Sequence, residues 1–417
     1  MKYQKIFNSH SEYESYISKR YLKPNVSVCK SGNSITEVHY TPVPPPQYLT
    51  FTAEQSNSTI RLNRVGSAET LPNATIWYST DSGETWNDYT YTQQGTRGFS
   101  GEVITLSHVG DKVMLKGRNE TLATDSFYQY HNFVMTGKIA ASGEIDTLLN
   151  ETGINAVLGT GCYMKLFSNC KSMTTAPELP NSKMAPSCYY IMFESCSTIT
   201  VAPELPSTEL ANACYGNMFR GCTGLTTPPE LPATTLADNC YTNMFNGCWS
   251  LATAPELPAT TLVQSCYSNM FNNCTGLRTA PELPATTISG WCCSGMFQGC
   301  TGLTTAPSIL PATYLYSYCY NQMFKGCRSL TTAPILPATN LSPYLGCSRA
   351  YGEMFSGCTN LNYIKAMFLT TPNTSYTKDW VAGVSSTGTF VKNSEANWNQ
   401  TGSYAIPTGW TVETASS

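Results

Sequence analysis

The chain has 417 residues, which is enough for two or three domains of ordinary size or for one domain plus a repeat array. Charged residues make up only 12% of it, about half of the usual ~25%, whereas 41% are hydrophobic, so a core can be buried. The net charge of -3 argues against nucleic acid or an anionic membrane surface as a partner, and no apolar run reaches the ~18 residues that predict a membrane-spanning helix.

Residues 1–40 are expected to form a small N-terminal module. A short helix is predicted around Ser11–Arg20, and VSVCKSGNSITEVHY (26–40) predicts a β-hairpin about the turn Ser31-Gly32-Asn33. The start of the chain lacks the apolar segment of a secretory signal, so we expect it not to use the general secretory route. TPVPPPQ (41–47) is expected to be a stiff proline linker.

Residues 48–145 predict a β-sandwich of the immunoglobulin type. The strand candidates are YLTFTA, STIRL, ATIWYS, EVITLS, KVMLKG and NFVMTG. Between them, Ser79, Asp81, Gly83, Thr85 and Trp86 spell S-x-D-x-G-x-T-W, which resembles the Asp-box of sialidase propellers. Because there is one copy and the motif itself stabilises a hairpin turn, we interpret it as structural, with a glycosidase as the minor alternative.

Residues 146–358 contain an internal repeat. Its eight copies include CYGNMFRGC (214–222), CYTNMFNGC (240–248) and CYSNMFNNC (266–274), and the first six begin at a period of 26 residues. A fixed period in this range predicts a solenoid, in which each unit buries its apolar face against the next one.

Each unit is predicted to contain a short amphipathic helix. Counting the first Cys as zero, apolar residues fall at 0, 1, 4, 5, 8 and 11, and at ~100° per residue they share one face of a helix. The segment LTTAPELP that follows is expected to be extended, because a residue before proline is pushed out of the α region. Since prolines such as Pro229 and Pro232 donate no N–H, the parallel ladder between units should be narrow and centred on LTT. The predicted fold class is therefore mixed, with an α/β solenoid of the leucine-rich-repeat type.

The repeat holds most of the cysteines, seven at its first Cys position and eight at its second, whereas Cys29, Cys293 and Cys347 lie elsewhere. On a helix the two cysteines of a unit would be ~12 Å apart, too far for a disulfide. Ala350 replaces the first Cys of the last unit, which suits a packing role. We therefore expect reduced thiols stacked from unit to unit, and no metal, because the spacing matches no zinc motif. The predicted core ladder comprises Cys188, Cys196, Cys214, Cys222, Cys240, Cys248, Cys266, Cys274, Phe193, Phe219, Phe245 and Phe271.

Two further rows recur at the repeat period. The first is a row of acidic residues in the APELP segments, namely Glu178, Glu204, Glu230, Glu256 and Glu282. We interpret it as a solvated ridge, with a stripe that binds a divalent cation or sugar hydroxyls as the functional alternative. The second is a row of tyrosines, expected to be core with satisfied hydroxyls, with a sugar platform as the alternative: Tyr163, Tyr189, Tyr215, Tyr241, Tyr267, Tyr320 and Tyr351.

The pattern GCxxLTxAPxLP…CYxxMFxGC resembles the BspA-like leucine-rich repeat, which occurs in surface and phage proteins of Bacteroides-type bacteria. The resemblance covers roughly residues 160–360, and the tail 359–417, with DWVAGVSSTGTFVKN and IPTGWTV, resembles the C-terminal cap of such proteins. The middle region resembles the β domain that precedes these repeats. The start, EYESYI…LKPNVSVC…EVHY, is similar to an N-terminal module of phage virion proteins.

The sequence shows no catalytic constellation. His10, His39, His108 and His131 are dispersed and lack a nucleophile partner, and there is no P-loop or dinucleotide fingerprint. We expect a protein that is not an enzyme and needs no cofactor.

The resemblance implies a virion protein, assembled in the host cytoplasm, that joins other virion proteins through residues 1–40 and binds a host-surface glycan or protein. The alternatives are a bacterial cell-surface adhesin and, last, a glycan-active enzyme. Fibre-like virion proteins are often trimers, so a homotrimer is kept as a hypothesis, and neither nucleic acid nor membrane insertion is expected.

Overall fold

The computed structural model describes residues 25–31, 34–41, 46–67, 71–94, 98–124, 126, 128–341 and 348–415. The chain divides into two compact units, Met1–Gln47 and Tyr48–Ser417. In the first unit, β1 (Asn25–Ser31) pairs antiparallel with β2 (Ser34–Thr41), which confirms the predicted hairpin. The helix predicted around Ser11–Arg20 and most of the proline linker lie outside the described residues.

The second unit begins with two β-sheets that pack together through rings such as Phe51 and Phe133, whose centroids are 5.1 Å apart. One sheet has the order β13-β12-β3-β10-β5-β6, and the other has the order β11-β4-β8-β7 with β9 paired to β4. All six predicted strands are present, because alternating burial along a strand leaves a clear period of two. The strands are β3 (Leu49–Ala53), β4 (Ser58–Val65), β5 (Ile76–Ser79), β6 (Asn87–Asp88), β7 (Tyr91–Gln94), β8 (Gly98–Gly101), β9 (Ile104–Leu106), β10 (Lys112–Gly117), β11 (Tyr130–Thr136), β12 (Ile139–Ser142) and β13 (Met173–Thr175).

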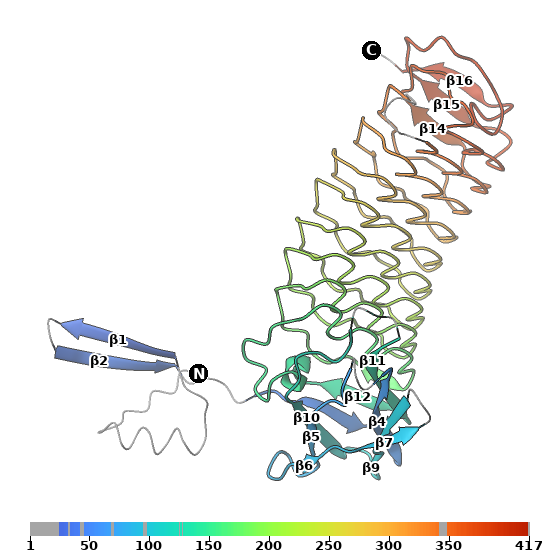
Figure 1. Ribbon diagram of the computed structural model, residues 1–417. Coiled ribbons are helices and arrows are strands. Elements are labelled where there is room, and N and C mark those ends of the chain that lie inside the picture. Colours follow the sequence, from blue (N-terminus) through green and yellow to red (C-terminus); the bar gives the residue numbers. More distant parts are fainter. Residues whose placement is uncertain are drawn as a thin grey trace. The chain divides into compact units, whose positions relative to one another are not determined.

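The two-sheet region continues directly into the repeat. After β12, the chain forms a 3-10 turn, η1 (Ile145–Leu148), and β12 then pairs in parallel with β13 of the first repeat unit. The Phe133 ring stacks on Phe167 of that unit at 5.2 Å, and the Cys170 thiol donates to the Phe133 carbonyl. The expected boundary at 145–146 therefore lies inside one compact unit with a shared core, and β11 closes the N-terminal end of the repeat (Figure 1).

The helix predicted for each unit is wrong, and with it the α/β class: the described residues contain strands, turns and the single 3-10 turn. Each CYxxMFxxC segment is a run of overlapping turns. In the unit that starts at Cys188, every second N–H donates to the carbonyl three residues earlier, and the N–H groups between them donate to the next unit. The turn bonds are Tyr190 to Ser187, Met192 to Tyr189 and Glu194 to Ile191, and the inter-unit bonds are Tyr189 to Cys214, Ile191 to Gly216 and Phe193 to Met218.

A positive φ recurs at every fourth residue of these segments, which we call turn ribbons. In the Cys188 unit these residues are Ser187, Ile191 and Ser195, with φ of 54°, 60° and 61°. A left-handed residue at the third position of a turn reverses the chain direction, so that half of the N–H groups face the neighbouring unit. An α-helix would use its interior N–H groups within itself and leave none to join the units. The stack of units therefore selects the ribbon.

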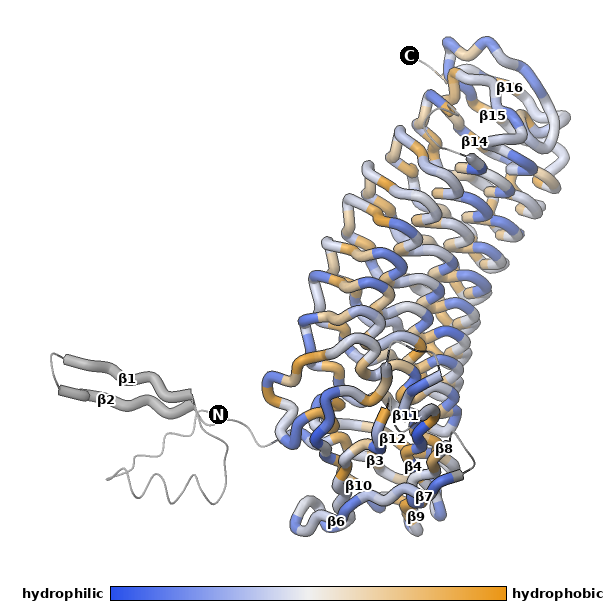
Figure 2. Tube along the Cα trace, in the orientation of Figure 1, coloured by the Kyte–Doolittle hydropathy of each residue, from blue (hydrophilic) through white to orange (hydrophobic). Residues whose placement is uncertain are grey.

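The core consists of columns of identical side chains. The phenylalanine rings of successive units stack with centroids 5.4 to 5.8 Å apart. The second cysteine of each unit donates its thiol to the phenylalanine carbonyl of the previous unit, as Cys222 does to Phe193 at 3.0 Å. The sixteen cysteines whose side chains the structure describes are all buried, free thiols. Figure 2 shows polar and apolar stretches that recur in register from coil to coil.

Outside the ribbons the units meet in single parallel bridges. Thr253 pairs with Thr279, and Thr279 pairs with Thr305, all in the LTT part or its equivalent. The narrow ladder predicted from the prolines is therefore confirmed at LTT. A second series of single bridges, such as Thr261 with Thr287, lies after the prolines, where none was predicted.

The C-terminal end carries a ninth ribbon that has lost its cysteines. Phe355 donates its N–H to the Trp380 carbonyl, and Asp379 and Gly383 have positive φ at the positions of the earlier ribbons. The fully buried Trp380 ring packs against Phe355, with centroids 6.1 Å apart. A parallel sheet completes this end with β14 (Tyr363–Ala366), β15 (Thr389–Lys392) and β16 (Thr411–Thr414).

Candidate binding surfaces

The tyrosine column is part of the core. Its seven rings are at most 2% exposed, so the sugar-platform alternative is wrong for these residues. At one end, Tyr163 donates its hydroxyl to Asp146 at 2.8 Å, and burial raises the pKa of that carboxyl to about 6. The hydroxyls of Tyr189 and Tyr215 have no hydrogen-bond partner among the described residues, so the expectation of satisfied hydroxyls holds only in part.

The five glutamates of the APELP segments are all exposed. At the start of the row, Glu144 and Glu178 form a parallel β-bridge through their backbones. Desolvation, together with the charge of Glu178, raises the pKa of the Glu144 carboxyl. At its end, the Glu282 carboxylate accepts hydrogen bonds from the Ser308 N–H at 3.0 Å and from the Ser308 hydroxyl at 2.9 Å. Glu282 therefore links its own unit to the next one through Ser308. Within the described ranges no three His, Cys, Asp or Glu side chains gather as metal ligands would.

An open groove follows the start of this row, with an apolar floor and glutamates at its rim. It is lined by Ala176, Pro177, Glu178, Leu179, Pro180, Ala202, Pro203, Glu204 and Pro206. The prolines keep this segment extended and leave little backbone N–H to offer a ligand.

The Asp-box forms the turn between β5 and β6, which confirms the structural interpretation. Asp81 accepts from the Ser79 hydroxyl at 2.6 Å and from the Thr85 N–H at 3.0 Å, and the Ser79 hydroxyl accepts from the Gly83 N–H. These bonds to the charged form lower the Asp81 pKa to about 2. The carboxylate is therefore committed to holding its own turn.

Two of the four histidines have described side chains, and they lie in different surroundings. His131 is buried, where its Nε2 accepts from the Ala74 N–H and its Nδ1 bonds the Leu122 carbonyl, and desolvation lowers its pKa to about 4. His108 is exposed beside Asp111. His10 lies outside the described residues, and the side chain of His39 is likewise not described.

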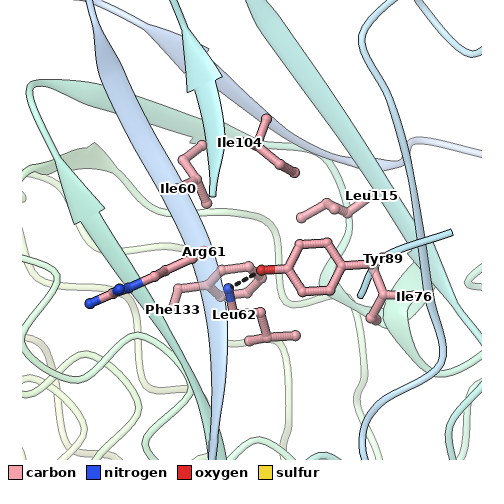
Figure 3. A pocket seen from close by; sticks show the side chains of 8 residues that line it. All are labelled: Ile60, Arg61, Leu62, Ile76, Tyr89, Ile104, Leu115 and Phe133. Carbon is pink, nitrogen blue, oxygen red and sulfur yellow. Dashed lines mark hydrogen bonds between the residues drawn. The ribbon is translucent and has the colours of Figure 1, made fainter. Parts of the chain in front are cut away.

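A small cavity lies between the two sheets (Figure 3). Its volume is about 10 Å³ and its walls are mainly apolar. Tyr89 crosses it, accepting from the Leu62 N–H at 2.7 Å and donating to the Glu102 carbonyl at 2.8 Å. This space is comparable to that of one water molecule, so it is a packing gap in the core.

Exposed aromatic rings occur on the later repeat units, where the sequence analysis singled out none. Trp249, Trp291, Tyr314 and Tyr316 are between 43% and 72% exposed. Trp291 stacks on Tyr318 with ring centroids 4.0 Å apart and an angle of 9° between the planes. Both residues directly precede the first Cys position, which is small in most earlier units, and that departure from the pattern is the signal that could have revealed them.

No helix within the described ranges is long and apolar enough to cross a membrane. Comparisons with protein-family models, with curated proteins and with solved structures find no match.

Proposed function

We propose that this chain is a non-enzymatic virion protein of the fibre type, whose repeats form a leucine-rich-repeat-like solenoid displayed for adhesion to the host cell surface. The observation that carries the proposal is the way in which the units stack. Their ladders use backbone and neutral core side chains, so the outward positions of every unit remain free to vary. A rigid stack with variable outward residues suits recognition of an extended surface.

The two ends support display as a finite rod. β11 covers the first ribbon with Phe133, and Trp380 covers the last phenylalanine of the column. Covered ends prevent further copies from adding to the stack, because a capped terminal unit exposes no apolar face on which another unit could pack. The lateral faces are then the surfaces that remain for binding.

The identity as a virion protein rests on the resemblance of the first 40 residues and of the BspA-like repeats. A bacterial cell-surface adhesin with the same repeats is the alternative, and it shares the adhesive role. In the virion version, the hairpin β1–β2 belongs to the part that joins other virion proteins.

Adsorption of the purified full chain to cells tests the adhesive role. Fluorescently labelled chain should bind Bacteroides-type cells saturably, and excess unlabelled chain should displace it. Binding that never saturates, or that the unlabelled chain does not reduce, would contradict the proposal.

A further inference from the structure

Trp291 and Tyr318 form a stacked pair on the surface of two neighbouring units. Their rings are nearly parallel, with centroids 4.0 Å apart, and Trp291 remains 43% exposed. Both residues have a positive φ, 60° and 59°, which a bulky side chain rarely adopts. The backbone of the ribbon imposes this conformation, and Gly161, Ser187, Ala213, Asn239 and Ser265 occupy the same position in the first five units.

The pair contributes little to the core. The core aromatic rings of these units, Phe297 and Phe324, are fully buried in their own column. Small residues meet the backbone requirement of the position in the earlier units, so stability does not call for an indole there. The two rings depart from the small residues that the first five units carry at this position, and exposed apolar surface of this kind marks candidate binding sites.

The Trp291 ring is stacked on one side and remains partly exposed. Tyr318 covers the face toward the following unit, so the opposite face looks toward the preceding unit, where the equivalent residue is Ser265. The Ser265 N–H donates to the carbonyl of Gly290 at 3.2 Å, which places Ser265 in the layer directly beside Trp291. Because its side chain is small, that layer has no ring to continue the stack.

Polar residues lie in the layer of Ser265 and in the layer before it. Gln264 is exposed, and its N–H donates to a carboxylate oxygen of Asp238, itself exposed, at 3.1 Å. A flat apolar ring, with a glutamine in the next layer and a carboxylate in the layer beyond it, suits a ligand with one apolar face and a rim of hydroxyls. A saccharide ring has this character, and the Asp238 carboxylate disfavours an acidic sugar.

We propose that the face of Trp291 opposite Tyr318 is a stacking site for a ring of a neutral saccharide, whose hydroxyls bond the Gln264 amide and the Asp238 carboxylate. This inference rests on the proposed adhesive function, because it names the class of ligand. It differs from the glutamate row and from the buried tyrosine column, which lie elsewhere on each unit.

Ligand-observed NMR on the full chain tests the site, with methyl β-galactoside, methyl β-glucoside and methyl β-glucuronide as probes. At least one neutral glycoside should receive saturation on its ring protons, and the glucuronide should receive less. Trp291→Ala should weaken the binding of that neutral glycoside by about tenfold or more. The matched control is Trp249→Ala, which removes another exposed indole of the repeat and should leave the affinity unchanged. Tyr318→Phe keeps the stacked ring and should also bind.

Lack of binding by both neutral glycosides, equal affinity in the Trp291→Ala variant, or a preference for the glucuronide would overturn the stacking site. Cell adsorption of the same variants separates this failure from failure of the proposed function. If no glycoside binds and the Trp291→Ala variant still adsorbs to cells, the adhesive function stands and the stacking site is refuted. Glycoside binding by a chain that does not adsorb to cells upholds the site and contradicts the adhesive function.

Discussion

Asn243 distinguishes the turn ribbon from the helix that the sequence suggests. It lies in the middle of the CYTNMFNGC segment with a φ of 55°. In a left-handed position glycine is favoured over alanine by about 1 kcal/mol or more, because alanine brings a Cβ close to the following carbonyl oxygen. In the interior of a helix, alanine is favoured over glycine by about 1 kcal/mol.

The comparison of Asn243→Gly with Asn243→Ala isolates this backbone effect. Both substitutions remove the hydrogen bond that the Asn246 side chain donates to Asn243 at 3.1 Å, so its loss cancels in their difference. The ribbon predicts that the glycine variant has the higher free energy of unfolding by about 1 kcal/mol, and a helix predicts the opposite sign. Asn246→Ala serves as the control for the lost bond, which should cost about 0.5–1.5 kcal/mol.

Urea unfolding of the three variants, followed by circular dichroism and by tryptophan fluorescence, supplies the measurement. An alanine variant that is more stable than the glycine variant would refute the ribbon geometry at this position. Glycine already stands at the equivalent position in the sixth unit, as Gly295 with a φ of 61°.

Three further predictions follow from burial. Burial raises the pKa of thiols such as that of Cys248 well above the usual value. Ellman's reagent should therefore leave the cysteines of the native chain largely unmodified and react fully only in denaturant. Rapid labelling of the native chain would contradict the buried columns. The pKa of Asp146 is raised to about 6 from an ordinary 3.8, so the stability that this carboxyl contributes is fully present below pH 4 and is lost as the pH rises through 6. The unfolding free energy of Asp146→Asn relative to wild type should therefore gain about 2 kcal/mol between pH 4 and 7, and a constant difference would refute this. Trp380→Ala should lower the free energy of unfolding by about 3–5 kcal/mol, because it uncovers Phe355. Trp249 is exposed, so Trp249→Ala should lower it by less than about 0.5 kcal/mol. Equal losses would show that Trp380 does not cap the stack.

The strands and the repeat were predictable because each leaves a simple period in the sequence. β4 alternates buried and half-buried residues along its whole length, and the LTT bridges follow from where proline removes N–H donors. Cysteine at all but one of the repeat positions likewise indicated columns of small buried side chains.

The turn ribbon was missed because apolar residues at 0, 1, 4, 5 and 8 fit a period of four as well as one of 3.6. Glycine, asparagine or serine every fourth residue, as at Asn239, Asn243 and Gly247, marks the left-handed positions and was the deciding signal. The ninth ribbon was not predicted because Tyr376, Trp380 and Val384 keep the apolar spacing of the repeat but not its residue types.

The candidate site was harder to predict than the fold. The tyrosine column could be a platform or a core until the neighbouring units were placed, and their stacking buries it. Trp291 and Tyr318 depart from the repeat, and an alignment of repeats draws attention to what the units share. The two rings meet because their units are neighbours in the stack. In the sequence this shows only as the same position in two successive copies of the repeat.

Mass spectrometry of gradient-purified phage particles tests the proposed function most directly, with peptides of this chain counted against those of the major capsid protein. A virion protein should be present at a fixed ratio to the capsid protein across independent preparations. Absence of the chain from the particles, together with its recovery from bacterial outer membranes, would contradict a virion protein and favour the cell-surface adhesin.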